Sequence, residues 1–260
     1  MVKPKIGLSM LYNLSKTFNE SVHEITKVDV KFIEVVDDGL HALDKRRVSE
    51  LRSLGESYGV RYSVHAPFAD INIASPSTPL LRTMVRRLED SLDNARALNA
   101  YLWIFHPGLE TGISMFYPGK AWIRNRKTVQ LLCKTAEDYG VKLAIENVPE
   151  PYPFLMKSVE HFKKFYGEFD GNLGLVLDIG HANLNGQIEL FIEAFPDRLM
   201  HIHVHDNDGT ADQHLGIGFG TVNWEKVAKA LKRVSYSGTI VVESVEHVHE
   251  SLRRLEALLV

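Results

Sequence analysis

Short apolar segments alternate strictly with longer amphipathic segments along the chain, eight of each, and this order restricts the fold more than any other feature of the sequence. The apolar segments hold five or six residues and are rich in Val, Ile, Leu and Phe. Several have few polar interruptions, which is typical of parallel strands buried on both faces. They span residues 6–10, 32–36, 61–65, 102–106, 142–147, 174–178, 200–205 and 239–243.

The amphipathic segments predict helices. They span residues 15–27, 44–58, 79–98, 122–139, 158–166, 188–194, 224–234 and 248–258. Gly59 and Gly140 follow two of them and are expected to end each helix in the left-handed conformation. Eight strand–helix pairs predict an α/β fold, a (β/α)8 TIM barrel in a single domain of residues 1–260. An open doubly wound sheet is the structural rival, but no glycine-rich nucleotide-binding fingerprint follows a strand.

The composition restricts the binding partners and the cellular location that we expect for this protein. The formal net charge of −3 gives no sign of nucleic-acid binding, and no segment approaches the roughly 20 apolar residues of a membrane span. We therefore expect a cytoplasmic protein without a membrane partner. Cys133 is the only cysteine, which excludes an intramolecular disulfide and a cysteine-based zinc site. The sequence leaves the oligomeric state open, and a homo-oligomer is compatible with it.

Polar residues able to bind a metal stand at the ends of the predicted strands, where a barrel builds its active site. In chain order they are Glu34, His65, His106, Glu146, Asp178, His181, His203, His205, Asp212, His214 and Glu243. Carboxylates are costly to bury, yet Glu146 and Glu243 close two of the most apolar runs. A divalent cation would relieve the repulsion between such carboxylates. Mixed imidazole and carboxylate ligands favour Zn, Mn, Co or Fe over Ca.

Some candidates have simpler explanations. Asp178 could cap a short helix that begins at His181, and His201 is expected to point into the helix layer, away from His203. Residues 206–209 predict a turn, and the glycines of 216–220 are expected to let their loop pack closely. Five other histidines are expected at the surface: His23, His41, His161, His247 and His249. Three aromatic residues are candidates for pocket walls: Phe68, Phe116 and Trp122.

Several motifs resemble the xylose isomerase-like TIM-barrel superfamily. They are His-Ala-Pro at 65–67, Ile-Glu-Asn at 145–147, Leu-Asp-Ile-Gly-His at 177–181, and His-Val-His-Asp-Asn at 203–207 followed by the segment 214–220. The superfamily includes sugar isomerases and epimerases, inosose dehydratase-like proteins and endonuclease IV. The resemblance extends from the first strand to Glu243 and implies a barrel with a divalent metal at the strand ends.

The ketose 3-epimerase-like pattern of this superfamily implies one metal and two catalytic glutamates. The matching metal ligands are Glu146, Asp178, His203 and Glu243. Glu146 and Glu243 would also move a proton through a metal-stabilised enediolate. Further substrate contacts would come from His106 and His181, and on weaker grounds from Glu34, Trp122 and His205. Such epimerases carry an arginine six residues beyond the seventh-strand histidine, where this chain has Gly209.

The endonuclease IV-like pattern implies three metals instead. Its nine ligands match His65, His106, Glu146, Asp178, His181, His203, Asp212, His214 and Glu243. The spacing of Asp212 and His214 is the most specific part of this match. Against it, the segment 9–13 lacks the glycine-rich pattern of the nucleases, and His205 stands where they have asparagine. The acidic total charge also disfavours DNA, because phosphate contacts dominate most DNA binding.

These patterns lead to one main hypothesis and several alternatives. We expect an isomerase or epimerase that depends on Mn, Co or Zn and acts on a sugar, sugar phosphate or inosose. The main alternative is a zinc-dependent AP endonuclease or phosphodiesterase, with nucleic acid as partner. A dehydratase or aldolase-type reaction and a non-catalytic binding barrel are further alternatives.

Overall fold

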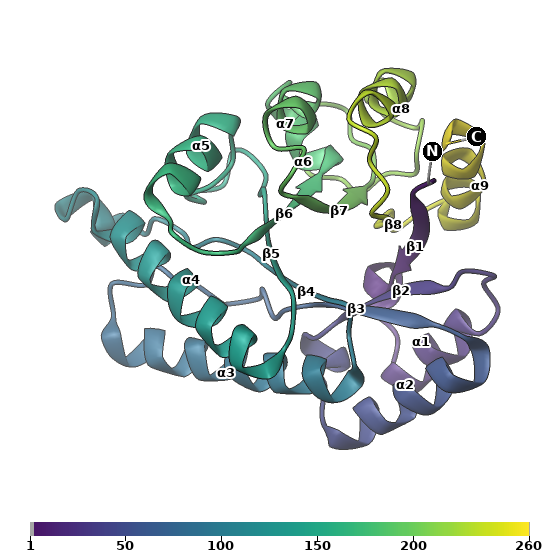
Figure 1. Ribbon diagram of the computed structural model, residues 1–260, viewed down its shortest axis with the longest axis horizontal. Coiled ribbons are helices and arrows are strands. Elements are labelled where there is room, and N and C mark those ends of the chain that lie inside the picture. The colour runs from purple at the N-terminus through teal and green to yellow at the C-terminus, as the bar shows by residue number, and fades with distance from the viewer. Residues whose placement is uncertain (1–2, 260) are drawn as a thin grey trace.

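Eight parallel strands close into a barrel in the computed structural model, which describes residues 3–259 (Figure 1). The strands are β1 (Lys5–Ser9), β2 (Phe32–Val36), β3 (Arg61–His65), β4 (Leu102–Phe105), β5 (Leu143–Glu146), β6 (Gly174–Asp178), β7 (Leu199–Val204) and β8 (Thr239–Val242). Each pairs in parallel with the next, and β8 pairs with β1 to complete the ring. The predicted TIM barrel is confirmed.

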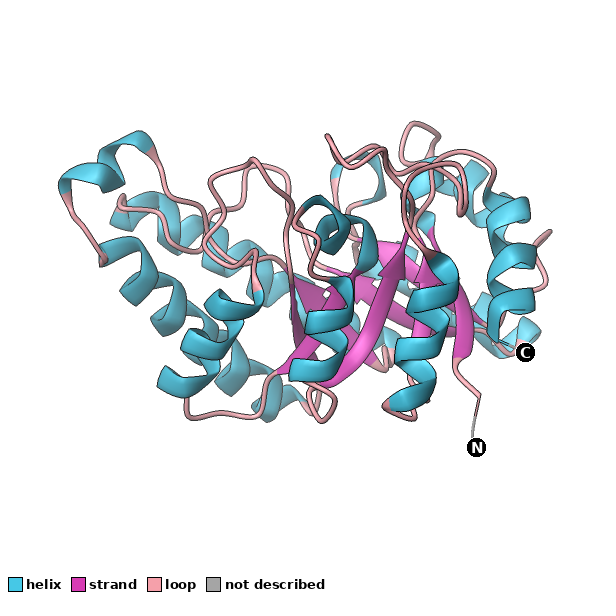
Figure 2. Cartoon of the chain, turned by 90° about the horizontal axis from the view of Figure 1, so that it is seen from above, coloured by secondary structure: helices cyan, strands magenta, loops and turns pink. Residues whose placement is uncertain are grey.

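Helices surround the ring of strands on the outside (Figures 1 and 2). They are α1 (Phe18–Ile25), α2 (Lys45–Tyr58), α3 (Thr78–Leu98), α4 (Lys120–Tyr139), α5 (Val159–Glu168), α6 (Ile179–Leu184), α7 (Ile188–Ala194), α8 (Trp224–Arg233) and α9 (Val248–Leu259), with short 3-10 turns η1 (Met10–Asn13), η2 (Gly39–His41) and η3 (Gly112–Phe116). Gly59 and Gly140 end α2 and α4 at φ of 67° and 68°, as predicted. None of the described helices is long and apolar enough to cross a membrane.

Helix starts follow local hydrogen bonding. The first helix begins at Phe18 rather than at 15, because Thr17 and Glu20 form a reciprocal capping box there. The sequence indicated α6 only as a short helix that Asp178 could cap. In the structure this helix begins directly after β6. Asp178 caps it, with Oδ1 accepting a 2.7 Å hydrogen bond from the backbone N–H of His181.

Two histidines are wrongly placed by the sequence analysis. His201 points into the barrel, not into the helix layer, because residues two apart on a strand share a face and His203 also points inward. His41 is buried rather than exposed, and its Nε2 lies 3.0 Å from the carbonyl oxygen of Lys16 and 3.3 Å from Ser21 Oγ. Of the other four, His161 is half-buried and three are exposed, as expected: His23, His247 and His249.

Candidate metal centre and active site

A cavity of about 350 Å³ opens at the carboxyl ends of the strands. Its polar lining consists of His65, His106, Glu146, His181, Asp212, His214 and Glu243. All seven stand at or after the end of a strand, where the sequence placed them. The barrel therefore brings together side chains that are up to 178 residues apart in the chain, from His65 to Glu243.

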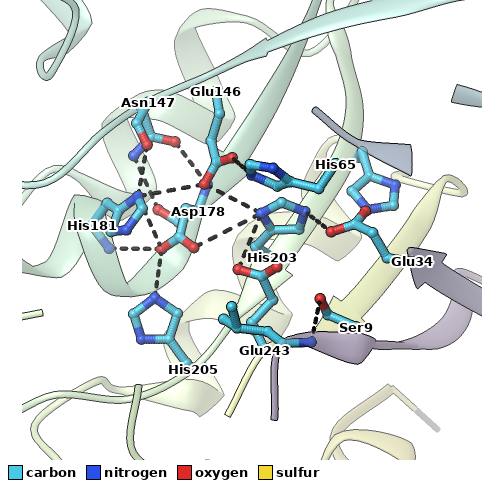
Figure 3. A network of polar contacts seen from close by, with 12 residues as sticks. Ser9, Glu34, His65, Glu146, Asn147, Asp178, His181, His203, His205 and Glu243 are labelled. Carbon is cyan, nitrogen blue, oxygen red and sulfur yellow. Dashed lines mark hydrogen bonds and ion pairs between the residues drawn. The ribbon is translucent and has the colours of Figure 1, made fainter. Parts of the chain in front are cut away.

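His203 is at the centre of the candidate metal site (Figure 3). Its Nδ1 lies 3.2 Å from Glu146 Oε1, 3.4 Å from Glu243 Oε2 and 4.0 Å from Asp178 Oδ2. All four residues are buried, and each offers a ligand atom within 4.8 Å of the others. Among the described residues, neither His203 Nδ1 nor Asp178 Oδ2 has a hydrogen-bond partner. Buried, unpaired and mutually repelling donors of this kind fit a divalent cation.

Glu34 lies beneath His203, in the barrel interior, and not in the cavity. Its Oε1 is 2.9 Å from His203 Nε2, its Oε2 is 3.1 Å from His201 Nε2, and it accepts a 2.9 Å hydrogen bond from Ser63 Oγ. The structure gives no support for the expected contact of Glu34 with substrate, because its carboxylate is fully buried by these partners and does not line the cavity. A carboxylate behind a metal-binding histidine instead fixes the ring and leaves the other nitrogen free for the metal.

A second group of donors lies on the other side of Glu146. His65 Nε2 and His106 Nε2 are each 3.3 Å from Glu146 Oε2. His65 Nδ1 donates a 2.9 Å hydrogen bond to the carbonyl oxygen of Ala66, so that Nε2 is the nitrogen that could bind a metal once it has released its proton. Both carboxylate oxygens of Glu146 are thus engaged, one toward His203 and one toward this histidine pair.

A third group consists of His181, His205, Asp212 and His214. His181 Nδ1 and His214 Nδ1 lie 2.8 Å and 3.0 Å from the carbonyl oxygens of Asn147 and Glu243, to which they donate. Their Nε2 atoms face Asp212 Oδ2 at 3.3 Å and 3.5 Å, and each ring would have to release its Nε2 proton before that nitrogen could bind a cation. This group could hold a second cation or the hydroxyl groups of a polyol.

His205 belongs to this third group but is fully buried behind it. Its Nε2 is 3.1 Å from Asp178 Oδ1, and its ring stacks on His214 with centroids 3.9 Å apart. It does not line the cavity, so the expected substrate contact is not observed. The stacked position is available because residue 180 is glycine, since a Cβ there would lie 2.0 Å from His205 Cε1.

The buried carboxylate of Asp206 fixes the conformation of the loop after β7. The sequence predicted only a turn at this residue. Asp206 accepts hydrogen bonds from the backbone N–H groups of Asn207, Gly218 and Val222, and from Trp224 Nε1 at 2.8 Å. As expected, the glycine-rich segment packs closely, since a Cβ at Gly220 would lie 2.2 Å from the carbonyl oxygen of Asn207. Asp212 and His214 are carried by this loop.

Two predicted aromatic wall residues lie elsewhere. Trp122 donates from Nε1 to Glu168 Oε2 at 2.8 Å on the outside of the barrel, and Lys164 covers its ring. Phe116 is 77% exposed in η3, outside the cavity. The helix face that Trp122 occupies depends on how α4 packs against α5, which its own sequence does not reveal. Phe68 does line the cavity, as expected.

The two central glutamates have opposite acidities. Burial alone would raise the pKa of Glu146, but the neighbouring His203 and His106 hold it well below its usual value. Burial, together with the carboxylates of Glu34 and Glu146, raises the pKa of Glu243 to about 7, against the opposing effect of His203. Paired groups separated in this way are suited to act as a base and an acid.

The fold and this site together define a TIM barrel with clustered histidine and carboxylate side chains at the strand ends. The chain belongs to the xylose isomerase-like TIM barrel family, whose model matches residues 22–258. The sequence-based family assignment is confirmed.

Several known proteins are similar over most of the chain. A solved structure described as a D-tagatose 3-epimerase-like protein has a TM-score of 0.92 and 30% identity, covering 98% of this chain and 97% of its own. Uncharacterized protein MJ1311 of Methanocaldococcus jannaschii is 31% identical over 98% of this chain and 88% of that protein. D-psicose 3-epimerase of Ruminiclostridium cellulolyticum is 22% identical over 85% of this chain and 76% of that enzyme. The relatives thus include a sugar epimerase.

Proposed function

We propose that the protein is a divalent-metal-dependent sugar isomerase or epimerase in which Glu146 and Glu243 transfer the proton. One observation carries this proposal: the two carboxylates, from β5 and from the end of β8, approach the same atom, His203 Nδ1, at 3.2 Å and 3.4 Å. Both also line the cavity. A substrate carbon bound in the cavity would therefore lie within reach of two proton-transferring groups.

The residues suited to hold the metal are Glu146, Asp178, His203 and Glu243. A cation bound there would supply Lewis-acid polarisation of the substrate carbonyl. Glu146, whose pKa is low, is ionised and would take a proton from the carbon next to that carbonyl. Glu243 would return a proton from the other side, through the carboxylate oxygen that does not approach His203, and the roles would reverse for the reverse reaction.

The test is solvent deuterium exchange. The Mn- or Co-loaded protein is incubated in deuterated water with ketoses, inososes and their phosphates, and the products are examined by NMR and mass spectrometry. We expect one deuterium at the carbon next to the carbonyl in at least one sugar. Glu146→Gln and Glu243→Gln should each abolish the exchange. Glu110→Gln is the matched control, because Glu110 is exposed on the same rim and does not line the cavity.

A second candidate function, phosphodiester hydrolysis, is favoured by one observation. The nine residues of the endonuclease IV-like pattern fall into three groups in the structure, and Glu146 belongs to two of them. Adjacent metals that share a carboxylate can activate a hydroxide for in-line attack. About three zinc atoms per chain together with nicking of abasic DNA would establish this function, whereas one exchangeable Mn or Co with deuterium uptake would exclude it.

A further inference from the structure

The interior of the barrel is divided into an apolar half and a polar half. Four buried side chains from β4, β5 and β6 pack on one another in the apolar half: Leu102, Ile104, Ala144 and Val176. The polar half includes four further buried side chains: Glu34, Ser63, His201 and His203. Apolar side chains of similar size would usually fill a core at a lower cost in free energy. The reason for the polar half must therefore lie in its contacts.

Glu34 is the centre of this polar half. Its Oε1 faces His203 Nε2 at 2.9 Å, a contact that Figure 3 shows as a dashed line. Its other oxygen, Oε2, accepts a 2.9 Å hydrogen bond from Ser63 Oγ and lies 3.1 Å from His201 Nε2. A carboxylate held through one oxygen can turn about its last carbon–carbon bond, whereas one held through both oxygens cannot. The contacts at Oε2 therefore fix the direction in which Oε1 points.

The register of the sheet places Ser63 beside this carboxylate. Ser63 on β3 is the pairing partner of Glu34 on β2, so the two side chains lie next to each other on the same face. Ser63 is also two residues before His65, which lines the cavity, and both side chains point inward. Its hydroxyl group has a single proton, which it donates to Glu34. Toward any further partner, the oxygen of Ser63 can only accept.

That further partner is Tyr101, whose hydroxyl group donates to Ser63 Oγ at 3.4 Å. Burial raises the pKa of Tyr101 to about 12, so the phenol keeps the proton that this hydrogen bond requires. Its ring packs edge-on against Phe32, with centroids 5.9 Å apart, and the guanidinium carbon of Arg61 lies 5.6 Å from its centroid. A chain of donors thus runs from Tyr101 through Ser63 to Glu34.

This donor chain starts at the end of the barrel opposite to the candidate active site. Tyr101 directly precedes β4. It lines a separate cavity of about 300 Å³, which lies beside the first residues of β3 and the last turns of α2 and α3. The candidate metal site lies at the carboxyl ends of the strands. The donor chain therefore connects the amino-terminal face of the barrel with the metal position through its interior.

We infer that Ser63 and Tyr101 are positioning residues of the metal site: they orient Glu34, which in turn orients the His203 ring so that Nδ1 faces the metal. Hydrogen bonds in a chain polarise one another, so the loss of the outer bond weakens the inner ones. Neither positioning residue lines the cavity of the candidate active site or belongs to the four candidate ligands. This inference rests on the metal site of the proposed function.

The test measures metal affinity, which a merely structural role would leave unchanged. Mn or Co is titrated into the metal-free protein by calorimetry, and the binding step that His203→Ala removes identifies the site. We expect Ser63→Ala to raise the Kd of this step by about 10-fold, as is usual for the outer partners of a metal ligand. Tyr101→Phe acts one hydrogen bond further away and should raise it by about 3-fold. The visible absorption spectrum of the cobalt-loaded protein should change in both variants.

Tyr62 provides the matched control for Tyr101. It lines the same amino-terminal cavity, but its hydroxyl group donates to the carbonyl oxygen of Leu51 at 2.9 Å. Tyr62→Phe should therefore lower the midpoint of urea denaturation and leave the metal Kd unchanged. A Kd that rises equally in Tyr62→Phe and Tyr101→Phe would overturn the inference, because it would reflect a general loosening of the fold.

The matched control for Ser63 is Ser91→Ala. Ser91 is equally buried, but its oxygen accepts a 3.0 Å hydrogen bond from Trp103 Nε1 between α3 and β4, outside the donor chain. This variant should lose stability in urea and bind metal as the wild type does. An increase in Kd as large as that in Ser63→Ala would count against a specific role of Ser63.

A second pair of variants separates the shape of residue 63 from its hydrogen bond. Threonine and valine have almost the same shape, and only threonine keeps the hydroxyl group. Ser63→Thr should therefore bind the metal about 10-fold more tightly than Ser63→Val. Equal affinities would overturn the inference. If the variants at residue 63 fail to fold, the comparison of Tyr101→Phe with Tyr62→Phe decides.

The outcomes also separate this inference from the proposed function. Wild-type metal affinity in both Ser63→Ala and Tyr101→Phe would overturn the inference and leave the isomerase function standing. Weaker binding in both variants, without deuterium exchange into any sugar by the wild type, would sustain the inference and overturn the isomerase function. A wild type in which His203→Ala removes no binding step would overturn both.

Discussion

Glu34 and His203 form a buried pair beneath the candidate metal site, with Glu34 Oε1 2.9 Å from His203 Nε2. The other ring nitrogen of His203 faces the carboxylates of Glu146 and Glu243. The pair therefore fixes which nitrogen is available to a metal, although Glu34 itself contacts neither the metal position nor the cavity.

Substitution of Glu34 should accordingly weaken metal binding. We expect Glu34→Gln to raise the Kd for Mn or Zn by about 10- to 100-fold, as is usual when the partner of a metal-binding histidine is removed. Calorimetric titration of the metal-free protein measures this directly. Glu246→Gln, an exposed change near the end of β8, should have no effect. Equal affinities for the wild type and Glu34→Gln would show that the pair is only structural.

Metal binding should weaken as the pH falls. Burial alone would lower the pKa of His203, but Glu243, Glu34 and Glu146 raise it well above its usual value, and the pKa of Glu243 is raised to about 7. Both groups must lose their protons to bind a cation, so binding releases protons. Below pH 7 Glu243 holds its proton increasingly, and affinity drops. Titrations in buffers of different ionisation enthalpy count the protons released; a count of zero at pH 6 would contradict the prediction.

Gly180→Ala should destabilise the protein through His205. The added Cβ would lie 2.0 Å from His205 Cε1, in a fully buried position where the ring cannot move without leaving Asp178. We expect a loss of about 1–3 kcal/mol in the free energy of unfolding, measured by urea denaturation. Gly167→Ala in α5 is the control, since nothing lies within 4 Å of its Cβ position. That change should be neutral or slightly stabilising.

Asp206 should be essential to the loop after β7. Asp206→Ala removes the acceptor of four hydrogen bonds and leaves buried donors unpaired, so we expect the free energy of unfolding to fall by about 3 kcal/mol or more. Asp208→Ala in the same loop removes an exposed carboxylate and should cost less than about 1 kcal/mol. Similar midpoints for the two variants in urea would refute this account of the loop.

The barrel could be predicted because each strand is encoded locally. The run 143–145, which Glu146 closes, is apolar over its whole length, and such runs are typical of parallel strands covered on both faces. The polar residues around the cavity could be predicted in the same way, because all strands of a parallel barrel have their carboxyl ends at the same face. The strand ends were therefore placed within two residues by sequence alone.

The roles of individual residues depended on contacts between distant segments. Glu34 and His201 form one buried pair, but nothing near either residue in the chain indicates the other. His201 could still have been placed by strand periodicity, because it is two residues from His203. Trp122 could not, since its side chain is directed by the packing of α4 on α5. The division of the candidate metal ligands into three groups likewise required the closed barrel.

Glu146 presents one oxygen to His203 and the other to His65 and His106. Because a carboxylate moves as a rigid plane, a rotation that suits one side must disturb the other. Substitutions at His65 and His203 should therefore be strongly non-additive in any property measured at the site. During evolution, a substitution on one side of Glu146 would need a compensating substitution on the other side. In a site whose residues are independent, each residue could be substituted alone.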